Sequence, residues 1–395
     1  MVLLMNSTGG NNMKKNILAL ALVGLMFTIN TSTAFADEVT YSKYTYTQKA
    51  KENNFELNQL KDDFEDQLKD YKTALRKKNA VEELTFEEID DNYKTKEARY
   101  TAAVVEFYNP LVEAKQYFDQ YVAYEKSLQS NKLQAELNFY NYIIAQKNAD
   151  NKSNSFKLMK TKFSVNDLEY ELGKISEINY KTFQKSYNDS YTSLLQAYGT
   201  LENAKNTLNK FIMMPITDKP ELDHIDITLP KYAIENIDEM AKTLLNSSYQ
   251  IQSLTLEKER IEGERTVLGR YSGVGSTQIN LENLRISLEE TVHKIEDAQL
   301  DIPYQLYTNY NNTLIADNNF KSAKLSFEIA KDKYEVDKIK NDHDMISTIE
   351  FIESKNAYDD AWANYMTQKL NAYKAIVEFN NFITLNTMAV PMDLK

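Results

Sequence analysis

Apolar side chains recur along much of this chain at steps of three and four residues. This spacing places them on one narrow stripe of an α-helix, which is the pattern of helices that pack as coiled coils. Two stripes consist of Tyr191, Leu194, Tyr198, Leu201, Leu208 and Ile212, and of Ala372, Ile376, Phe379 and Ile383. The 395 residues include only 9 glycines and 6 prolines, so few positions favour the end of a helix. We therefore predict an all-α protein of long, antiparallel coiled-coil helices.

Local signals divide this pattern into segments. Thr85 and Glu88 have the spacing of a capping box, and Pro110 restarts or kinks the helix that follows. Three prolines within 215–234 indicate a linker, in which 225–229 has a strand-like pattern. Turns or breaks are predicted at 148–155, at Gly173, at 269–277, at Pro303 and at 341–344. The predicted helices span 42–79, 86–108, 110–147, 156–214, 236–268 and 278–385.

The chain also contains an internal sequence repeat. The hexapeptide Tyr170–Ile175 reads YELGKI, and Tyr334–Ile339 reads YEVDKI. Each is followed by a long helical pattern that ends in Phe-Ile, at Phe211 in the first case and at Phe382 in the second. The second interval from Tyr to Phe is longer than the first by one heptad, which would preserve the buried face. In a second alignment, 54–60 matches 248–254. We predict a tandem duplication with a first helical repeat at 37–214, the linker at 215–234 and a second helical repeat at 235–395.

The N-terminal segment has the features of a secretory signal peptide. Lys14 and Lys15 precede an apolar run from Ile17 to Phe27, and Ala34-Phe35-Ala36 matches a cleavage site. We expect export, with 1–36 as the signal region and Met13 as its start. The apolar run is short for a membrane span, and no later run approaches the roughly 18 apolar residues that a spanning helix needs.

Composition excludes several classes of partner. The formal net charge is −12, and removal of the two signal lysines makes it −14. An acidic protein repels nucleic acid and anionic lipid, so we expect no nucleic-acid partner. The chain has no cysteine, so helix packing without disulfides must stabilise the exported protein.

The histidines and acid pairs of the chain lack the spacing of a metal site or a catalytic site. His224, His293 and His343 fall in separate segments, without the spacing of a metal site, and we expect neither cofactor nor metal. Acid pairs such as Asp90-Asp91 and Asp359-Asp360 lie in strongly charged helical segments. General acid–base catalysis requires carboxylates in a shaped, partly dry pocket, so we interpret these pairs as solvated faces and predict that the chain is not an enzyme.

Several short motifs resemble the TolC-like outer-membrane efflux protein family. Ala50–Asn54 is similar to the opening A-x-x-N-N helix of that family, and 208–215 is similar to the end of its first repeat. The stretch 229–252 is similar to the start of its second repeat. Tyr170–Ser176 resembles its R-Y-x-x-G-x-x-S helix turn, whereas the start of the following helix, 177–179, matches weakly. The resemblance covers most of the exported chain through short, degenerate motifs.

The resemblance implies a homotrimer whose helices form a hollow α-barrel, a conduit for exported solutes or polypeptides. It also implies a hairpin-shaped adaptor (membrane fusion) protein and an inner-membrane pump as partners. The adaptor-docking tip would contain Leu172, Gly173, Lys174, Ile175 and Ser176, together with Asp337, Lys338 and Ile339 from a second turn at Asp337–Lys340. Glycine permits a sharp reversal at such a turn. Asp337, Asp342 and Asp344 are candidate pore-lining acids that would favour cations.

One feature of the family is missing from the sequence pattern. The family inserts a pair of membrane strands in each half, and a spanning hairpin needs over about 20 residues. The two candidate sites, 148–155 and 269–277, are too short and do not alternate apolar with polar residues. We therefore predict a TolC-like α-barrel protomer without a β-barrel, located in the cell envelope, whereas the family is located in the outer membrane.

Two other functions are compatible with long helices. A structural or adhesive coiled-coil protein of the envelope is the main alternative, although such proteins usually carry many copies of a shorter repeat. A helical pore-forming toxin would need an apolar hairpin of about 20 residues, and the exported chain has none.

Overall fold

The computed structural model describes residues 40–79, 84–223, 226–232, 235–271, 273 and 278–388. The predicted signal peptide, the first residue of the predicted strand at 225–229 and most of the predicted loop at 269–277 lie outside these residues. From Tyr41 onward the chain forms one unit. The long elements of the described part are all α-helices, which confirms the predicted fold class.

The described residues form these elements in chain order. They are β1 (Thr40–Tyr41), α2 (Lys43–Glu52), α3 (Phe55–Asn79), α4 (Phe86–Asn92), α5 (Lys96–Ala103), the π-helix η1 (Val104–Tyr108), α6 (Asn109–Glu171), α7 (Glu177–Phe211), β2 (Glu221–Leu222), α8 (Ile237–Ser247), α9 (Tyr249–Arg270), α10 (Gln278–Asp342) and α11 (Thr348–Thr387). The two short strands pair with each other, and 226–229 is not a strand, so the predicted strand position is wrong.

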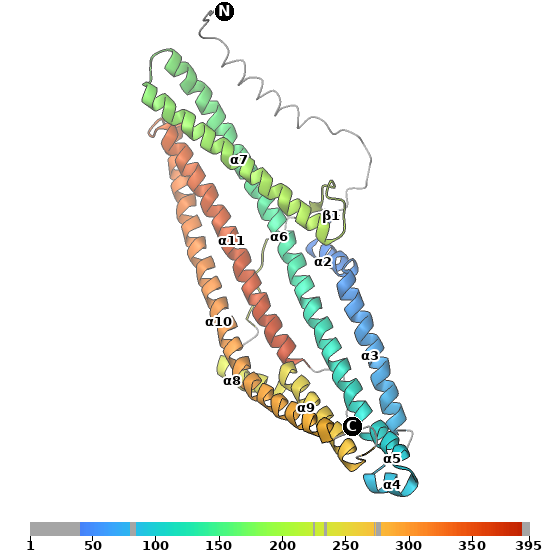
Figure 1. Ribbon diagram of the computed structural model, residues 1–395. Helices are drawn as coiled ribbons and strands as arrows, with labels where there is room; N and C mark the ends of the chain where they lie inside the picture. Colours follow the sequence, from blue (N-terminus) through green and yellow to red (C-terminus); the bar gives the residue numbers. More distant parts are fainter. Residues whose placement is uncertain are drawn as a thin grey trace, which may run out of the picture. The chain divides into compact units, whose positions relative to one another are not determined.

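Two helical hairpins dominate the structure. Helix α6, of 63 residues, folds back on α7, and α10, of 65 residues, folds back on α11. Figure 1 shows the two hairpin turns at one end of the unit and α4 with α5 at the other. Helix α3 packs along α6, and α9 packs along α10, so each hairpin is extended by one more helix.

The predicted turn at 148–155 is wrong, because α6 runs through it without interruption. The segment contains no glycine or proline, and its polar residues bond to α11 instead of ending the helix. Lys152 pairs with Asp360 at 2.6 Å, and Ser155 donates a hydrogen bond of 2.7 Å to Asp359. Ala149 and Ser155 are buried. Tertiary contacts therefore determine the local structure where composition alone indicated a loop.

Pro303 also fails to interrupt its helix. A proline inside a helix costs roughly 3 kcal/mol, because it removes one hydrogen bond and crowds the preceding turn. Here the neighbouring residues Ile302 and Leu306 are buried in a core cluster with Leu244 of α8 and Phe379 of α11. Burial of several large apolar side chains, at about 1.5–3 kcal/mol each, is enough to offset that cost.

The core of the unit lies where α2, α6, α7, α11 and the linker meet. Tyr46, Phe139 and Leu208 are among its fully buried side chains, and Tyr41 and Ile227 join it from the segments around the helices. The hydroxyl of Tyr46 donates to the backbone carbonyl of Leu208. The linker at 215–234 therefore contributes to the core through Ile227.

The connection between α3 and α6 is a small helical cap. Thr85 and Glu88 form the predicted capping box of α4. Ile89 of α4, Ala103 of α5 and Val267 of α9 are buried together. The pKa of Asp90 is lowered, chiefly by the hydrogen bond from Arg270 of α9. The cap thereby ties the end of α9 to the first half of the chain.

No helix in the described ranges combines the length and apolar character that crossing a membrane requires.

Candidate functional site

The turn between α6 and α7 has the geometry expected for a sharp reversal. Gly173 has φ of 69°, a left-handed conformation that glycine adopts at little cost. The N–H of Lys174 bonds to the carbonyl of Glu169 at 2.8 Å, which closes the end of α6. The Ser176 hydroxyl then accepts from the N–H of Asn179 and starts α7. The predicted turn around Gly173 is confirmed.

The second turn overlaps the break predicted at 341–344 and lies one heptad beyond the position predicted from the repeat. Asp337, Lys338 and Ile339 are within the last turns of α10, so the predicted reversal at Asp337–Lys340 is wrong. Asp344 is the left-handed residue, with φ of 54°, and the N–H of Met345 bonds to the carbonyl of Lys340 at 2.8 Å. Ser347 then caps α11 in a capping box with Glu350.

The two turns are equivalent residue by residue. The left-handed residue Gly173 corresponds to Asp344, and the cap residue Ser176 corresponds to Ser347, with the same offset in sequence position for both pairs. On this offset the counterpart of Tyr170–Ile175 is 341–346, not 334–339. YELGKI and YEVDKI are similar although they are not equivalent in position, because the hairpins carry aromatic residues at heptad spacing.

A ladder of aromatic rings joins the two helices of each hairpin near its turn. In the first hairpin, Phe163 of α6 contacts Tyr180 and Tyr187 of α7, with ring centroids 6.0 and 4.8 Å apart. In the second, the ring of Tyr334 lies between Phe351 and Tyr358. The two trios are related by the same offset as the two turns, so Tyr334 is the counterpart of Phe163.

Apolar side chains are exposed near both turns. They stand on α6 and α10 or just beyond these helices, close to the reversals, and between 49 % and 71 % of each is accessible to solvent. They are Val165, Leu168 and Leu172 at the first tip, and Val336, Ile339 and Met345 at the second. Ile175 is half-buried, whereas Lys174 and Ser176 are exposed. Other apolar side chains are exposed farther along the helices, such as Leu195 and Ile315, so exposure alone does not single out the tips.

The three candidate pore acids differ from one another. Asp337 is only 9 % exposed and pairs with Lys340 at 3.7 Å. Asp342 and Asp344 are exposed at the second turn. Asp337 is therefore engaged within its own chain, and Asp342 and Asp344 are the acids of this group that face solvent.

The hairpins are linked to each other by buried polar contacts between α6 and α11. Asp359 is fully buried, accepts from Ser155 and pairs with Lys355. Farther from the turns, the Tyr373 hydroxyl donates to the buried Glu136 at 2.6 Å. Burial is the main cause of the raised pKa of Tyr373, and its bond to Glu136 adds to the effect. The hydroxyl therefore stays protonated and remains a donor.

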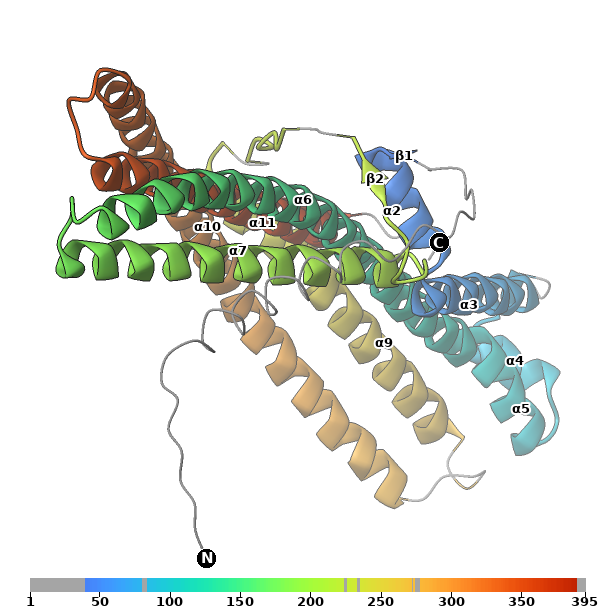
Figure 2. The ribbon, with the colours of Figure 1, turned by 90° about the horizontal axis from the view of Figure 1, so that it is seen from above.

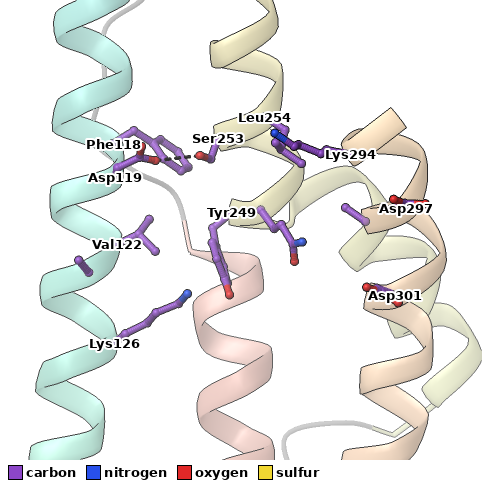
Figure 3. Close-up of a pocket in the computed structure, with 13 residues that line it drawn as sticks. Phe118, Asp119, Val122, Lys126, Tyr249, Ser253, Leu254, Lys294, Asp297 and Asp301 are labelled. Atoms are coloured by element: carbon purple, nitrogen blue, oxygen red, sulfur yellow. Dashed lines mark hydrogen bonds between the residues drawn. The ribbon is translucent and has the colours of Figure 1, made fainter. Parts of the chain in front are cut away.

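A groove of about 480 Å³ lies among α6, α9 and α10 (Figure 3). Phe118, Val122 and Tyr249 supply apolar lining, while Asp297 and Asp301 stand on α10. Its charges are of both signs and converge on no single point. Among the residues that the structure describes, no three His, Asp or Glu side chains gather where a metal ion could bind.

Solved structures share this fold over almost the whole chain. The Campylobacter jejuni CmeC outer membrane channel matches with a TM-score of 0.66 and 11 % identity, over 92 % of each chain. The open state of the Neisseria gonorrhoeae MtrE outer membrane channel matches with a TM-score of 0.59 and 10 % identity, over 87 % of this chain and 89 % of that one. The Vibrio cholerae outer membrane protein VceC matches with a TM-score of 0.57 and 8 % identity, over 86 % of this chain and 95 % of that one.

At such low identities these matches establish the fold, and they agree with the predicted resemblance to TolC-like channels. No protein-family model matches the chain, and no curated protein matches its sequence.

The left-handed turn generates a prediction about stability. Gly173→Ala should lower the free energy of unfolding by about 1 kcal/mol, because a side chain disfavours positive φ even though nothing crowds the added methyl group. Gly199→Ala, in the middle of α7 with equally open surroundings, should raise it by up to about 1 kcal/mol. Urea denaturation of the purified chain measures both. Stabilisation by both substitutions would contradict the geometry of the turn.

Proposed function

We propose that this chain is the outer-component channel of an efflux or secretion system, exported to the cell envelope. The observation that carries the proposal is the match in fold to outer membrane channels, which for the Campylobacter jejuni CmeC channel covers 92 % of each chain. A fold of two long helical hairpins suits a conduit, because side-by-side long helices can enclose a path.

A conduit requires several copies, because one pair of hairpins cannot surround a bore. We propose a homotrimer in which the hairpins of three chains form one α-barrel. The two halves would act as tandem repeats, at 37–214 and 235–395, joined by the linker at 215–234. The exposed apolar side chains on α10 and α7, among them Ile279, Ile286 and Leu195, support association with other helices.

The hairpin tips are the proposed docking site for a hairpin-shaped adaptor protein, which would connect the channel to an inner-membrane pump. Leu172, Val336 and Ile339 offer apolar contacts, and Gly173 at the turn leaves room for close approach. An adaptor with heptad-patterned helices would pack on them as coiled coils pack.

The first prediction from this proposal concerns assembly. The purified mature chain should have three times the mass of one chain by light scattering after size exclusion, and electron microscopy should show a ring with a central opening. An elongated monomer at all concentrations would refute the conduit and favour the structural coiled-coil protein instead.

The second prediction concerns docking. A photo-crosslinking residue in place of Leu172 or Val336 should capture, in the native cell, a protein whose sequence predicts two long heptad helices joined by a turn. Lys77, exposed on α3 at the other end of the unit, is the matched control and should not capture it. Equal capture at Lys77 would mean that the tips are not the docking site.

The third prediction concerns the exposed acids of the second turn. If Asp342 and Asp344 surround the bore, three copies of each would attract cations. Replacing both by asparagine should lower the ratio of cation to anion conductance of the assembled channel several-fold, and the paired Asp337→Asn should change it little. An unchanged ratio in the double variant would exclude these acids from the path.

A further inference from the structure

A groove of about 390 Å³ lies between α2 and the middle of α6, and lysines supply most of its charge. Figure 1 places α2 away from the two hairpin turns, and Figure 2 shows it beside β1 and β2. Lys43 and Lys51 stand about two turns apart on one face of α2, whereas Lys132 and Glu136 stand about one turn apart on α6. Two helix faces therefore bring three lysines to one groove.

The charge of this groove has the opposite sign to that of the chain. Glu136 is the one acid among its described lining residues, so three lysines less one glutamate leave a formal charge of +2. The groove among α6, α9 and α10, in contrast, is lined by three aspartates and two lysines. Within the described residues, neither Lys51 nor Lys132 has an acidic partner. The groove between α2 and α6 thus holds uncompensated positive charge.

Lys43 is held in place by side chains of α6 and α11. Its Nζ lies 3.5 Å from the carboxylate of Glu136, which also accepts the 2.6 Å hydrogen bond from Tyr373. The same Nζ lies 5.7 and 5.8 Å from the ring centroids of Tyr140 and Tyr373, within the range of a cation–π contact. Because these contacts engage Glu136 fully, Lys51 and Lys132 require a negative charge from outside the chain.

Asn131 lines the same groove with an amide that the chain does not satisfy. The residue is only 7 % exposed, and its Oδ1 is buried without a hydrogen-bond partner among the described residues. A buried polar group without a partner lowers stability, so such groups are rare in folded proteins. Rotation about the Cβ–Cγ bond exchanges the amide oxygen and nitrogen, so this side chain can also offer a donor to an anion. The groove therefore lacks a polar partner that the single chain does not supply.

Apolar surface in the groove suits an organic group attached to the anion. The side chain of Tyr44 is 70 % exposed, and Leu128 is half-buried. A tyrosine ring offers an apolar face with a polar hydroxyl at its edge. The volume of the groove lies within the range of about 300–1,000 Å³ that is usual for small-molecule sites. A bare phosphate ion would therefore leave most of the groove to water.

We propose that this groove binds a soluble phosphate ester. Its phosphate lies among the three lysines and Asn131, and its organic group contacts Tyr44 and Leu128. A phosphate monoester carries about −1.5 to −2 charges at pH 7, which neutralises the +2 of the groove better than one carboxylate would. Lysine binds phosphate as a point charge, without the fork by which arginine selects carboxylates.

The acidity of the whole chain favours a small ligand over an anionic surface. An extended anionic surface, such as a lipid bilayer, meets the field of the whole negative protein and is repelled. A small ester inside the groove is screened from acids more than about 8 Å away at about 0.15 M salt, so the lysines around it dominate. The site goes beyond the proposed conduit and does not depend on the number of chains in the assembly.

Isothermal titration calorimetry of the exported chain with phenyl phosphate tests the site. Binding should saturate at one ligand per chain with a Kd below about 1 mM, and phenol, which has the ring without the charge, should bind at least about ten-fold more weakly. Lys51→Met with Lys132→Met should weaken the binding of phenyl phosphate at least about ten-fold. Lys72→Met with Lys77→Met is the matched control, because it removes the same charge from exposed positions on α3, and it should change the affinity less than about two-fold.

Asn131→Leu separates binding from folding. It should weaken the binding of phenyl phosphate several-fold while the urea midpoint stays the same or rises, because an apolar group of similar size replaces an unpaired buried amide. A lower midpoint with unchanged affinity would show that the amide is structural and overturn its place in the site.

The remaining outcomes separate the site from its alternatives. If neither phenyl phosphate nor inorganic phosphate binds with saturation, the site is overturned and the conduit is untouched. Equal affinity for the two would overturn the contact of the organic group with Tyr44 and Leu128. Retention on phosphatidylcholine vesicles that contain phosphatidic acid, if it requires Lys51 and Lys132, would replace the soluble ester by a lipid headgroup. A monomer by light scattering would refute the conduit alone.

Discussion

The packing of α6 against α9 and α11 holds the two halves of this chain together. The buried polar contacts of α6 with α11 join residues more than 200 positions apart, as in the bond from Ser155 to Asp359 and that from Tyr373 to Glu136. A buried carboxylate such as Asp359 is tolerated only with its partners in place, because the desolvation of an unpaired charge costs several kcal/mol. These contacts therefore fix the register of α11 on α6, and with it the relative position of the two tips.

The hairpins themselves depend on a simpler constraint, the heptad spacing of large side chains. Phe163 and Tyr334 each stack between two rings of the returning helix. Such a ladder packs well but recurs every seven residues, so it specifies the face of the helix better than the position along it. The turn residues, Gly173 and Asp344, supply the missing information, since the left-handed conformation can occur only where the helix ends.

This division explains why the sequence placed the first turn at Gly173 but indicated two positions for the second, 337–340 and 341–344. Gly173 is a strong signal, because glycine adopts positive φ at little cost. Asp344 adopts the same left-handed conformation, but aspartate is also common on helix surfaces and so is a weaker signal. The hexapeptide YEVDKI, one heptad earlier, resembles the first turn more closely in sequence. The helix caps Ser176 and Ser347, which are equivalent in the two hairpins, carry the correct register in the sequence.

The sequence by itself determined the class of the fold, the long helices, the buried stripe of α11, the break near 341–344 and the turn at Gly173, because periodicity and helix-ending residues act locally. Only the tertiary structure decided that 148–155 is helical, that Pro303 lies inside α10 and that Asp337 is paired rather than free. For the first two, a distant element supplies the deciding interaction: α11 bonds Lys152 and Ser155, and buried neighbours from α8 and α11 surround the turn that contains Pro303. Local preferences of about 1–3 kcal/mol yield to such contacts, whose partners are far away in the sequence.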